Sequence, residues 1–196
     1  MKQVKFCTRE QGLEILAERN RNRTAFDVLS YAPYPFRMLS PFFYWRELGL
    51  NLKLIVPEQS MYAYSVESIW QGSKIIDGKT NFDMFKSRPY KRPSKHESEF
   101  SKVKGFLLGN EIITDYVEAR KKIFVPAYTQ MYNKFRYNPL INSANLAIHA
   151  NLLNNIEVFL YDVDDNPNIE DISKPYSHAA LLVDLITQIK TRFIYH

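Results

Sequence analysis

The most regular pattern in the chain is a helical one that begins at Ser65. Glu67, Gln71 and Lys74 recur at spacings of four and then three residues, which places them on one stripe of a helix. Apolar residues that suit a buried core occupy the neighbouring stripe: Val66, Ile69, Trp70 and Ile76. Ser65 is a favourable N-cap, and the positive end of the helix dipole favours the ionised form of Glu67. We therefore expect an amphipathic helix with a carboxylate, an amide and an amine along one side.

Hydrophobic periodicity elsewhere predicts an α+β fold that is predominantly helical, with a few short strands. Helical spacing occurs in residues 8–20, 41–49, 82–86, 111–134, 139–153 and 179–193. Alternating polarity predicts strands in residues 4–6, 25–29, 52–56 and 156–161. Pro126 lacks a backbone donor, so we expect a kink or break near Phe124. In the helix over 139–153 we expect the buried face to carry Leu140, Leu146 and Leu153.

Composition favours one cytoplasmic domain that spans residues 1–196. The chain has 196 residues of which 45% are hydrophobic, enough to bury one sizeable core. Cys7 is the single cysteine, which excludes an internal disulfide framework, and no Cys/His cluster has zinc-ligand spacing. No apolar stretch approaches the roughly 18 residues that span a bilayer, and the N-terminus lacks an apolar signal core. We therefore expect no membrane partner, no metal and no cofactor.

Positive charge is concentrated in one segment of the chain. The formal net charge is +5 and the sequence pI is about 9.1. Residues 87–104 are polar and weakly patterned, which predicts a long loop. The cations in and beside it are Lys86, Arg88, Lys91, Arg92, Lys95, Lys102 and Lys104. They suit contacts with the phosphates of a nucleic acid, and they equally suit a solvated loop.

The polar stripe of the predicted helix has aromatic surroundings. Tyr62, Tyr64 and Trp70 lie in or next to the helix, and residues 36–45 are unusually aromatic. A carboxylate, an amide and an amine among aromatic rings are typical of a ligand cleft, whereas a solvated helix face is the alternative. The order Ser65-Val66-Glu67, Gln71 and Lys74 also resembles the S-x-E-x-x-x-Q-x-x-K signature of the NADAR superfamily, the YbiA-like proteins.

This resemblance implies a YbiA-like fold and hydrolysis of N-glycosidic bonds in ADP-ribosylated or related ribosyl compounds. In such a reaction Glu67 stabilises the oxocarbenium-like charge or activates the attacking water. Lys74 balances the charge of Glu67, binds a pyrophosphate or protonates the leaving base, and Gln71 holds ribose hydroxyls. The aromatic residues expected to stack on the adenine or the modified base are Tyr44, Tyr64 and Trp70.

Acidic residues follow the last predicted strand and precede the final helix. The NADAR pattern has a late acidic residue before a helix with a Leu-Leu run, which resembles Leu181-Leu182 here. We prefer Asp162 as the second catalytic carboxylate, because it directly ends an apolar run that would hold it rigidly. Asp164 and Asp165 are the alternatives, and a solvated acidic turn is the non-functional interpretation.

Arg120 is a further candidate for ligand binding. Its guanidinium could bind a pyrophosphate with two hydrogen bonds, or form a surface ion pair with Glu118 or Asp115.

The candidate residues as a whole are compatible with two functions from different classes. The first is an N-glycosidase with an ADP-ribose-containing substrate, such as a modified nucleic acid. The second is a non-catalytic protein that binds ADP-ribose or nucleic acid in the same cleft.

Overall fold

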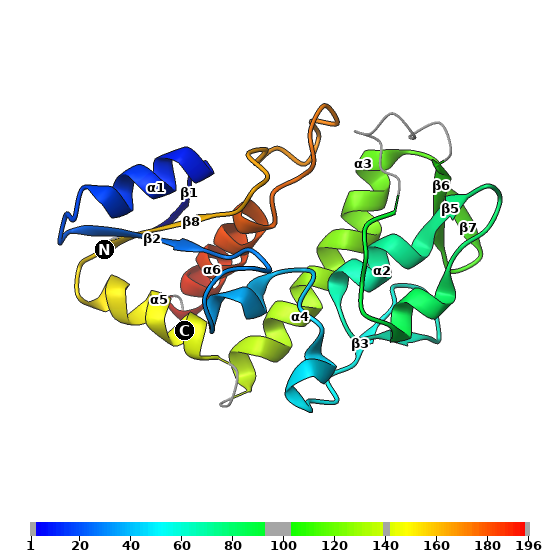
Figure 1. Cartoon of the computed structure of the whole chain (residues 1–196), viewed down its shortest axis with the longest axis horizontal. Helices are drawn as coiled ribbons and strands as arrows, with labels where there is room; N and C mark the ends of the chain where they lie inside the picture. The colour runs from blue at the N-terminus through cyan, green and yellow to red at the C-terminus, as the bar shows by residue number, and fades with distance from the viewer. Residues whose placement is uncertain (1–2, 93–102, 139–141, 195–196) are drawn as a thin grey trace. The chain divides into compact units, whose positions relative to one another are not determined.

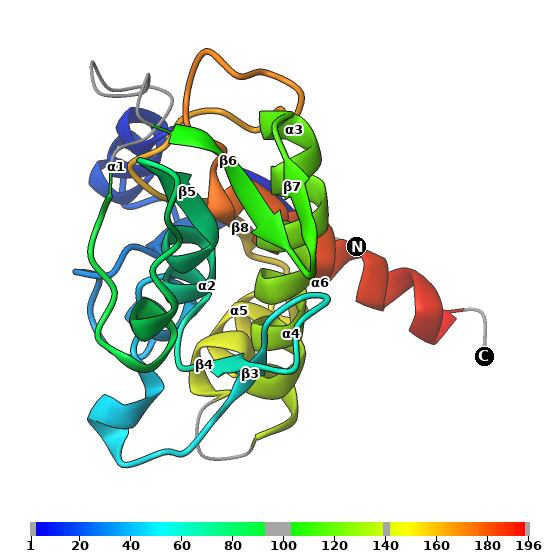
Figure 2. The same ribbon diagram turned by 90° about the vertical axis from the view of Figure 1, so that its right-hand side faces the viewer.

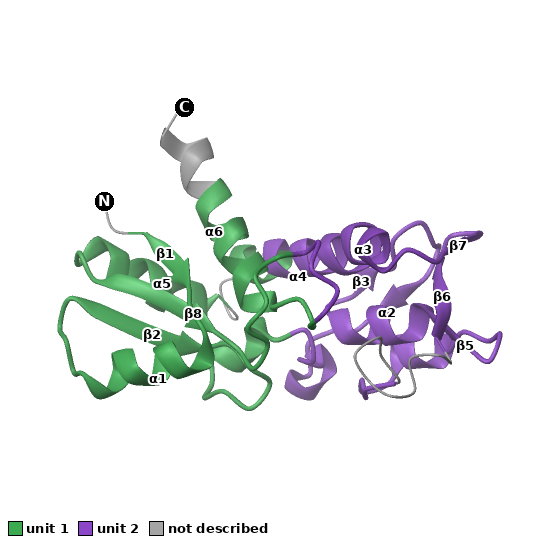
Figure 3. Cartoon of the chain, turned by 90° about the horizontal axis from the view of Figure 1, so that it is seen from above, with its two compact units in different colours: residues 1–40, 134–168, 174–196 green, residues 41–133, 169–173 purple. Residues whose placement is uncertain are grey.

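The computed structural model describes residues 3–92, 103–138 and 142–194, with side chains up to residue 188. These residues form two compact units (Figure 3). Unit 1 comprises residues 1–40, 134–168 and 174–196, and unit 2 comprises residues 41–133 and 169–173. The fold is thus a mixture of helices and short strands, as the sequence predicted, and the expectation of a single domain over 1–196 stays a prediction. No helix in the described ranges is both long enough and apolar enough to cross a membrane.

Unit 1 is built on a parallel sheet of three strands. Strand β8 (Glu157–Tyr161) lies between β1 (Val4–Phe6) and β2 (Arg23–Asp27). The strands predicted over 4–6 and 156–161 are confirmed, and the one predicted over 25–29 begins and ends two residues earlier. Both pairs are parallel, so the strands are joined by crossover connections, because a parallel neighbour cannot be reached by a tight turn.

Three helices pack against this sheet. They are α1 (Arg9–Ala17), α5 (Ser143–Leu153) and α6 (His178–Ile194), and α1 and α5 lie on opposite faces (Figure 1). Thr8 and Gln11 form the capping box of α1. The buried face of α5 differs from the one expected, because Leu146 is 57% exposed and Leu153 is 84% exposed. The third expected residue, Leu140, lies outside the described residues. Small and branched residues fill the core in their place: Ala144, Ile148 and Leu152.

Unit 2 contains the helix that the Ser65 pattern predicted, although it is shorter than expected. Helix α2 (Val66–Ser73) begins where Ser65 Oγ accepts the Ser68 amide at 3.0 Å, which confirms the N-cap. The helix ends before Lys74, whose backbone is extended and starts strand β5 (Lys74–Ile76). The prediction that Lys74 continues the helical stripe is therefore wrong. The branched residues after it favour a strand, and β5 finds a partner far along the sequence.

The partner of β5 is a hairpin that was not predicted. Strands β6 (Val103–Leu108) and β7 (Glu111–Ile113) pair antiparallel, and β6 also pairs with β5 (Figure 2). The predicted loop over 87–104 therefore ends earlier, and the predicted helix over 111–134 begins later than expected. It starts with α3 (Tyr116–Ala119), which Asp115 caps. Residues 93–102 of the predicted loop lie outside the described residues.

The long helical segment predicted over 111–134 is irregular just before Pro126. A π-helical stretch, Arg120–Phe124, follows α3 and leads into α4 (Val125–Tyr137). The predicted break near Phe124 is not found: the π-helical stretch leads directly into α4, and the helix continues through Pro126 despite the missing donor.

Short elements complete both units. Unit 2 contains strands β3 (Leu54–Ile55) and β4 (Tyr62–Ala63) and the 3₁₀ turns η2 (Trp45–Leu48) and η3 (Phe82–Lys86). The predicted helix over 41–49 is thus reduced to η2, whose end at the left-handed Gly49 was expected from the sequence. Unit 1 contains one such turn in the same part of the chain, η1 (Phe36–Leu39).

The position of α2 depends on a close approach at Gly72. A Cβ atom at this residue would lie 2.4 Å from Cε1 of Phe85 on η3. We expect Gly72→Ala to lower the free energy of unfolding by about 1–3 kcal/mol, because the added methyl overpacks a fully buried contact. Urea denaturation measures this, and Phe85→Leu should offset part of the loss in the double variant. An unchanged unfolding midpoint in Gly72→Ala would contradict the close approach.

Candidate functional site

The polar residues of α2 and the start of β5 are buried. Glu67, Gln71 and Lys74 are 6%, 4% and 1% exposed. The alternative of a solvated helix face is therefore wrong. Ionisable side chains are rarely buried to this degree, because each loses its hydration and must be compensated by partners in the protein. A glutamate and a lysine buried near one amide thus indicate a site that is maintained at a cost in stability.

Hydrogen bonds connect these three side chains through Arg92. Gln71 Nε2 donates to Glu67 Oε1 at 2.6 Å, and Gln71 Oε1 accepts the backbone amide of Arg92 at 3.0 Å. The Lys74 ammonium donates to the Arg92 carbonyl at 3.2 Å. Gln71 therefore has its amide fixed at both ends, and it orients the Glu67 carboxylate. Although Lys74 lies outside the helix, it contacts Arg92, as Gln71 does.

Arg92 also closes the end of α2 with its side chain. Its Nη1 donates to the carbonyls of Gln71 and Lys74 at 2.6 and 3.3 Å. The Gln71 carbonyl belongs to the last turn of α2, where no intrahelical donor is available, and the Lys74 carbonyl belongs to the first residue of β5. Burial lowers the pKa of the Arg92 guanidinium. The sequence suggested Arg92 only as one cation of the basic segment, and no local signal indicates its contacts with α2.

The aromatic candidates lie in two separate groups. Trp70 is 8% exposed and stacks on Phe106 with ring centroids 4.3 Å apart, while Tyr116 and Phe124 meet it edge-on. Trp70 thus belongs to the core between α2 and β6, and its stacking on a ligand stays a prediction. The rings of Tyr44 and Tyr64 form the second group, with centroids 6.0 Å apart.

Arg120 forms hydrogen bonds with a segment of unit 2 that lies far from it in the sequence. Its Nη1 donates to the carbonyls of Ile169 and Asp171 at 2.8 and 2.7 Å, and its guanidinium lies 4.7 Å from the centroid of the Tyr116 ring. The residue is almost completely buried. Its burial is at odds with the surface position that one alternative assumed, and Glu118 pairs with Lys122 at 2.6 Å. The structure gives Arg120 a structural task, and pyrophosphate binding stays a prediction.

Asp162 lies in unit 1, at the start of α6. Its Oδ2 accepts hydrogen bonds from the Ser177 hydroxyl at 3.0 Å, from His178 Nδ1 at 2.7 Å and from the Ala179 amide at 3.0 Å. Its Oδ1 accepts the Asp164 amide at 2.6 Å. These contacts hold the Asp162 carboxylate in one orientation, and its catalytic role stays a prediction. Both of its oxygens cap the helix and the preceding turn.

His178 completes this cluster as a buried cation. Its Nδ1 faces the Asp162 carboxylate and its Nε2 faces the Val28 carbonyl at 2.9 Å. Because both partners are acceptors, both ring nitrogens must carry a proton. Burial opposes the charge, but Asp162 outweighs it and raises the pKa of His178. Burial likewise opposes ionisation of Asp162, but His178 and backbone amides lower its pKa.

The alternative acidic residues are less confined. Asp164 is half-buried and gives its amide to Asp162. Asp165 is exposed, and its Oδ1 accepts the Arg9 amide at 3.3 Å. Glu67 belongs to unit 2 and the acidic turn to unit 1, so the convergence of two carboxylates on one substrate stays a prediction. Within the described ranges, no group of three or more His, Cys, Asp and Glu residues could hold a metal ion.

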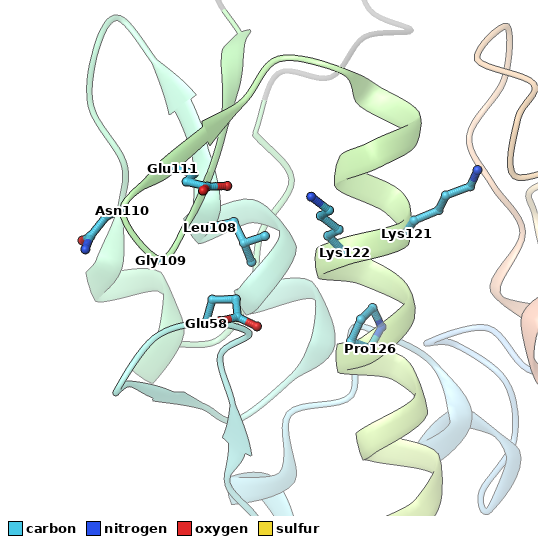
Figure 4. Close-up of a pocket in the computed structure, with 8 residues that line it drawn as sticks. All are labelled: Glu58, Leu108, Gly109, Asn110, Glu111, Lys121, Lys122 and Pro126. Atoms are coloured by element: carbon cyan, nitrogen blue, oxygen red, sulfur yellow. The ribbon is translucent and has the colours of Figure 1, made fainter.

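Unit 2 also has an open pocket that the sequence did not suggest. Its volume is about 680 Å³, and its lining residues are Glu58, Leu108, Gly109, Asn110, Glu111, Lys121, Lys122 and Pro126 (Figure 4). Lys121 pairs with Glu170 and Lys122 with Glu118, so carboxylates neutralise both cations. None of the predicted site residues lines this pocket.

The fold and the site together define a protein of mixed α and β structure with a buried Glu–Gln–Lys cluster. The chain belongs to a family of unknown function, DUF6939, whose model matches residues 8–182. This range runs from the cap of α1 into α6 and so includes every predicted site residue. No curated protein and no solved structure matches the chain.

Proposed function

We propose that the protein is an N-glycosidase that hydrolyses the N-glycosidic bond of an ADP-ribosylated substrate. The substrate class comprises a modified nucleic-acid base, a nucleotide or a related ribosyl compound. The observation that carries the proposal is the buried cluster of Glu67, Gln71 and Lys74, whose members share partners by hydrogen bonding. The resemblance of the same residues to the NADAR signature supports the chemistry.

The chemistry follows from the charge that the reaction develops. As the bond between ribose and base breaks, its electron pair goes to the base nitrogen and positive charge builds at the anomeric carbon. A carboxylate at this position stabilises that charge and takes a proton from the attacking water. Glu67 suits this role, since Gln71 fixes its orientation and the start of α2 favours its ionised form.

Lys74 supplies the complementary positive charge. Its ammonium donates a proton to the leaving base or binds the pyrophosphate of the ligand. Tyr44 and Tyr64 provide aromatic surfaces for stacking in the same unit.

A non-catalytic function is the second candidate, and the geometry of Asp162 favours it. Both oxygens of this carboxylate accept hydrogen bonds from the protein. A two-carboxylate hydrolase requires a second acidic group that faces the substrate, whereas a protein that binds ADP-ribose or nucleic acid requires none.

Incubation with a panel of substrates distinguishes the two candidates. The panel contains ADP-ribosylated single- and double-stranded DNA, ADP-ribosylated RNA, ADP-ribosylated nucleotides and free ADP-ribose. Mass spectrometry follows release of the free base and of the ribosyl product, and calorimetry follows binding. Release with catalytic turnover supports the hydrolase, and binding without release supports the non-catalytic candidate. Absence of both, across the whole panel, would overturn both.

A further inference from the structure

Three tyrosines of unit 2 form a connected group of rings. Tyr64 lies in the middle and meets Tyr44 and Tyr62 edge-on, with ring centroids 6.0 and 5.7 Å apart. Tyr44 precedes η2, and Tyr62 belongs to β4, so two separate segments supply the group. Tyr64 is buried, whereas Tyr44 and Tyr62 are half-buried and reach the surface. Edge-to-face contacts of this kind hold the rings in defined orientations.

Three cations lie over the faces of these rings. The ammonium groups of Lys53 and Lys86 lie 4.3 and 5.4 Å from the centroid of the Tyr62 ring. The Arg46 guanidinium lies 5.0 Å from the centroid of the Tyr64 ring. The distances are within the range of cation–π attraction, which orders these long side chains. We call the six residues the tyrosine–cation surface: Tyr44, Arg46, Lys53, Tyr62, Tyr64 and Lys86.

The surface carries a net positive charge. Its nearest acidic neighbour in the sequence, Glu47, pairs with Arg88 at 2.5 Å, so a fourth cation already neutralises that carboxylate. Within the described part of the chain, Arg46 and Lys86 form no ion pair with a carboxylate. Like charges that are held close together repel one another, and a polyanion relieves this repulsion.

We propose that the tyrosine–cation surface binds single-stranded nucleic acid. Cations next to aromatic rings match a chain in which phosphates alternate with bases, and base stacking on tyrosine tolerates any sequence. Arg46, Lys53 and Lys86 contact the phosphates. When Lys86 turns to a phosphate, the face of Tyr62 that it covered becomes available to a base.

Two features favour this partner over a membrane and over a long duplex. A helix or patch that binds lipid headgroups buries aliphatic or tryptophan side chains below its cations. The tyrosine–cation surface contains neither, and its rings carry polar hydroxyl groups, one of which donates from Tyr44 to the Lys86 carbonyl at 2.9 Å. Paired bases in a duplex expose no face to a protein ring, whereas those of a single strand do.

The inference goes beyond the proposed hydrolysis and does not depend on it. It also changes the sequence-based expectation for nucleic acid, which rested on the basic segment over 86–104. Lys86 is the one member of that segment in the surface, and the other two cations come from residues 46 and 53. A substrate strand held here would bring polymeric nucleic acid to the unit that contains Glu67.

Fluorescence anisotropy with a labelled 12-nucleotide oligo(dT), at a series of salt concentrations, tests the proposal. The test variant combines Arg46→Gln, Lys53→Gln and Lys86→Gln. The control variant removes the same charge from exposed positions of unit 2 with Lys79→Gln, Lys91→Gln and Lys104→Gln. Two control positions lie in the basic segment, so the comparison also separates the surface from that segment.

We expect the test variant to lose about two units of the slope of log Kobs against log salt, because about 0.7 counterions are released per phosphate contact on a single strand. The control variant should keep the wild-type slope and most of the affinity. Tyr62→Leu should weaken binding by about fivefold or more through lost stacking and leave the slope unchanged. Thermal melting verifies that each variant is folded.

Three results would overturn the proposal. The first is absence of oligo(dT) binding by the wild-type protein at low salt. The second is an equal loss of affinity in the test and control variants, which would mean that binding depends on the overall positive charge of the protein and not on the tyrosine–cation surface. The third is stronger binding to vesicles that contain phosphatidylserine than to oligo(dT), which would identify a membrane contact.

Discussion

Replacing Glu67 by Gln is expected to reduce N-glycoside hydrolysis by about 10²–10⁴-fold, the range for loss of one positioned acid or base. The amide has the shape of the carboxylate but cannot take a proton from water or stabilise positive charge on the ribose. The loss should appear in kcat, because the charge that Glu67 opposes develops only in the transition state.

Stability and ligand affinity should change little in Glu67→Gln. The new side chain can present its carbonyl oxygen to Gln71 Nε2 and so keep the hydrogen bond that Glu67 Oε1 accepts at 2.6 Å. The Lys74 contact with the Arg92 carbonyl does not involve Glu67. Glu58→Gln is the matched control, since it makes the same chemical change at an exposed residue of unit 2. Wild-type turnover by Glu67→Gln, on every substrate that the wild-type protein cleaves, would disprove the catalytic assignment.

The second large effect is expected at Asp162, where the measured quantity is stability. Asp162→Asn removes the charge that faces the buried His178 and should lower the free energy of unfolding by about 3 kcal/mol or more, as for other broken buried pairs. Asp164→Asn and Asp165→Asn should cost much less, because the charge of Asp162 is the larger influence on His178 and that of Asp164 is the smaller one. Urea denaturation of the three variants provides the comparison, and equal losses in all three would contradict it.

The same variants test the catalytic prediction for Asp162. The sequence-based expectation is a loss of about 10²–10⁴-fold in kcat, the range for a positioned acid or base. Activity must therefore be expressed per folded molecule, with the folded fraction taken from the denaturation curves. A near-normal kcat for folded Asp162→Asn, together with a large loss in Asp165→Asn, would transfer the catalytic role to Asp165.

The Asp162–His178 pair also predicts how stability depends on pH. The pKa of Asp162 is lowered from 3.8, so its contribution is present above that value and is lost as pH falls through the folded pKa. The pKa of His178 is raised from 6.5, so its contribution is complete below that value and is lost as pH rises through the folded pKa. The stability difference between wild type and Asp162→Asn should therefore be largest between about pH 4 and 6.5. A difference that stays constant from pH 3 to 9 would contradict the ion pair.

Local chemistry explains which parts of the fold the sequence could predict. Ser65 and Thr8 cap their helices with bonds to residues three positions away, so the signal and the contact lie in the same few residues. Lys74 was misplaced because the strand that starts there pairs with β6, about thirty residues later. Its register is a tertiary contact, which overrides the helical spacing of the preceding residues.

In the candidate site, too, contacts within a few residues of each other could be predicted, whereas contacts between distant residues could not. The spacing of Glu67 and Gln71 predicted that they lie on one side of a helix, and the structure joins them there by a hydrogen bond. Arg92 was not predicted as their neighbour, because a contact between residues 71 and 92 leaves no periodic pattern. On α5, leucines occupy both faces, so periodicity could not distinguish the buried Leu152 from the exposed Leu153.

The contacts of Arg120 constrain how this protein can be divided for expression. Residues 169–173 belong to unit 2, although the segments on both sides of them belong to unit 1. A fragment over 41–133 would lack the Ile169 and Asp171 carbonyls that accept from Arg120 Nη1. It would retain a buried guanidinium without those acceptors, and a fragment without 41–133 would break unit 1 into separate pieces. Genetic dissection of the two units therefore requires a redesigned chain order, with residues 169–173 joined to unit 2 through a new linker.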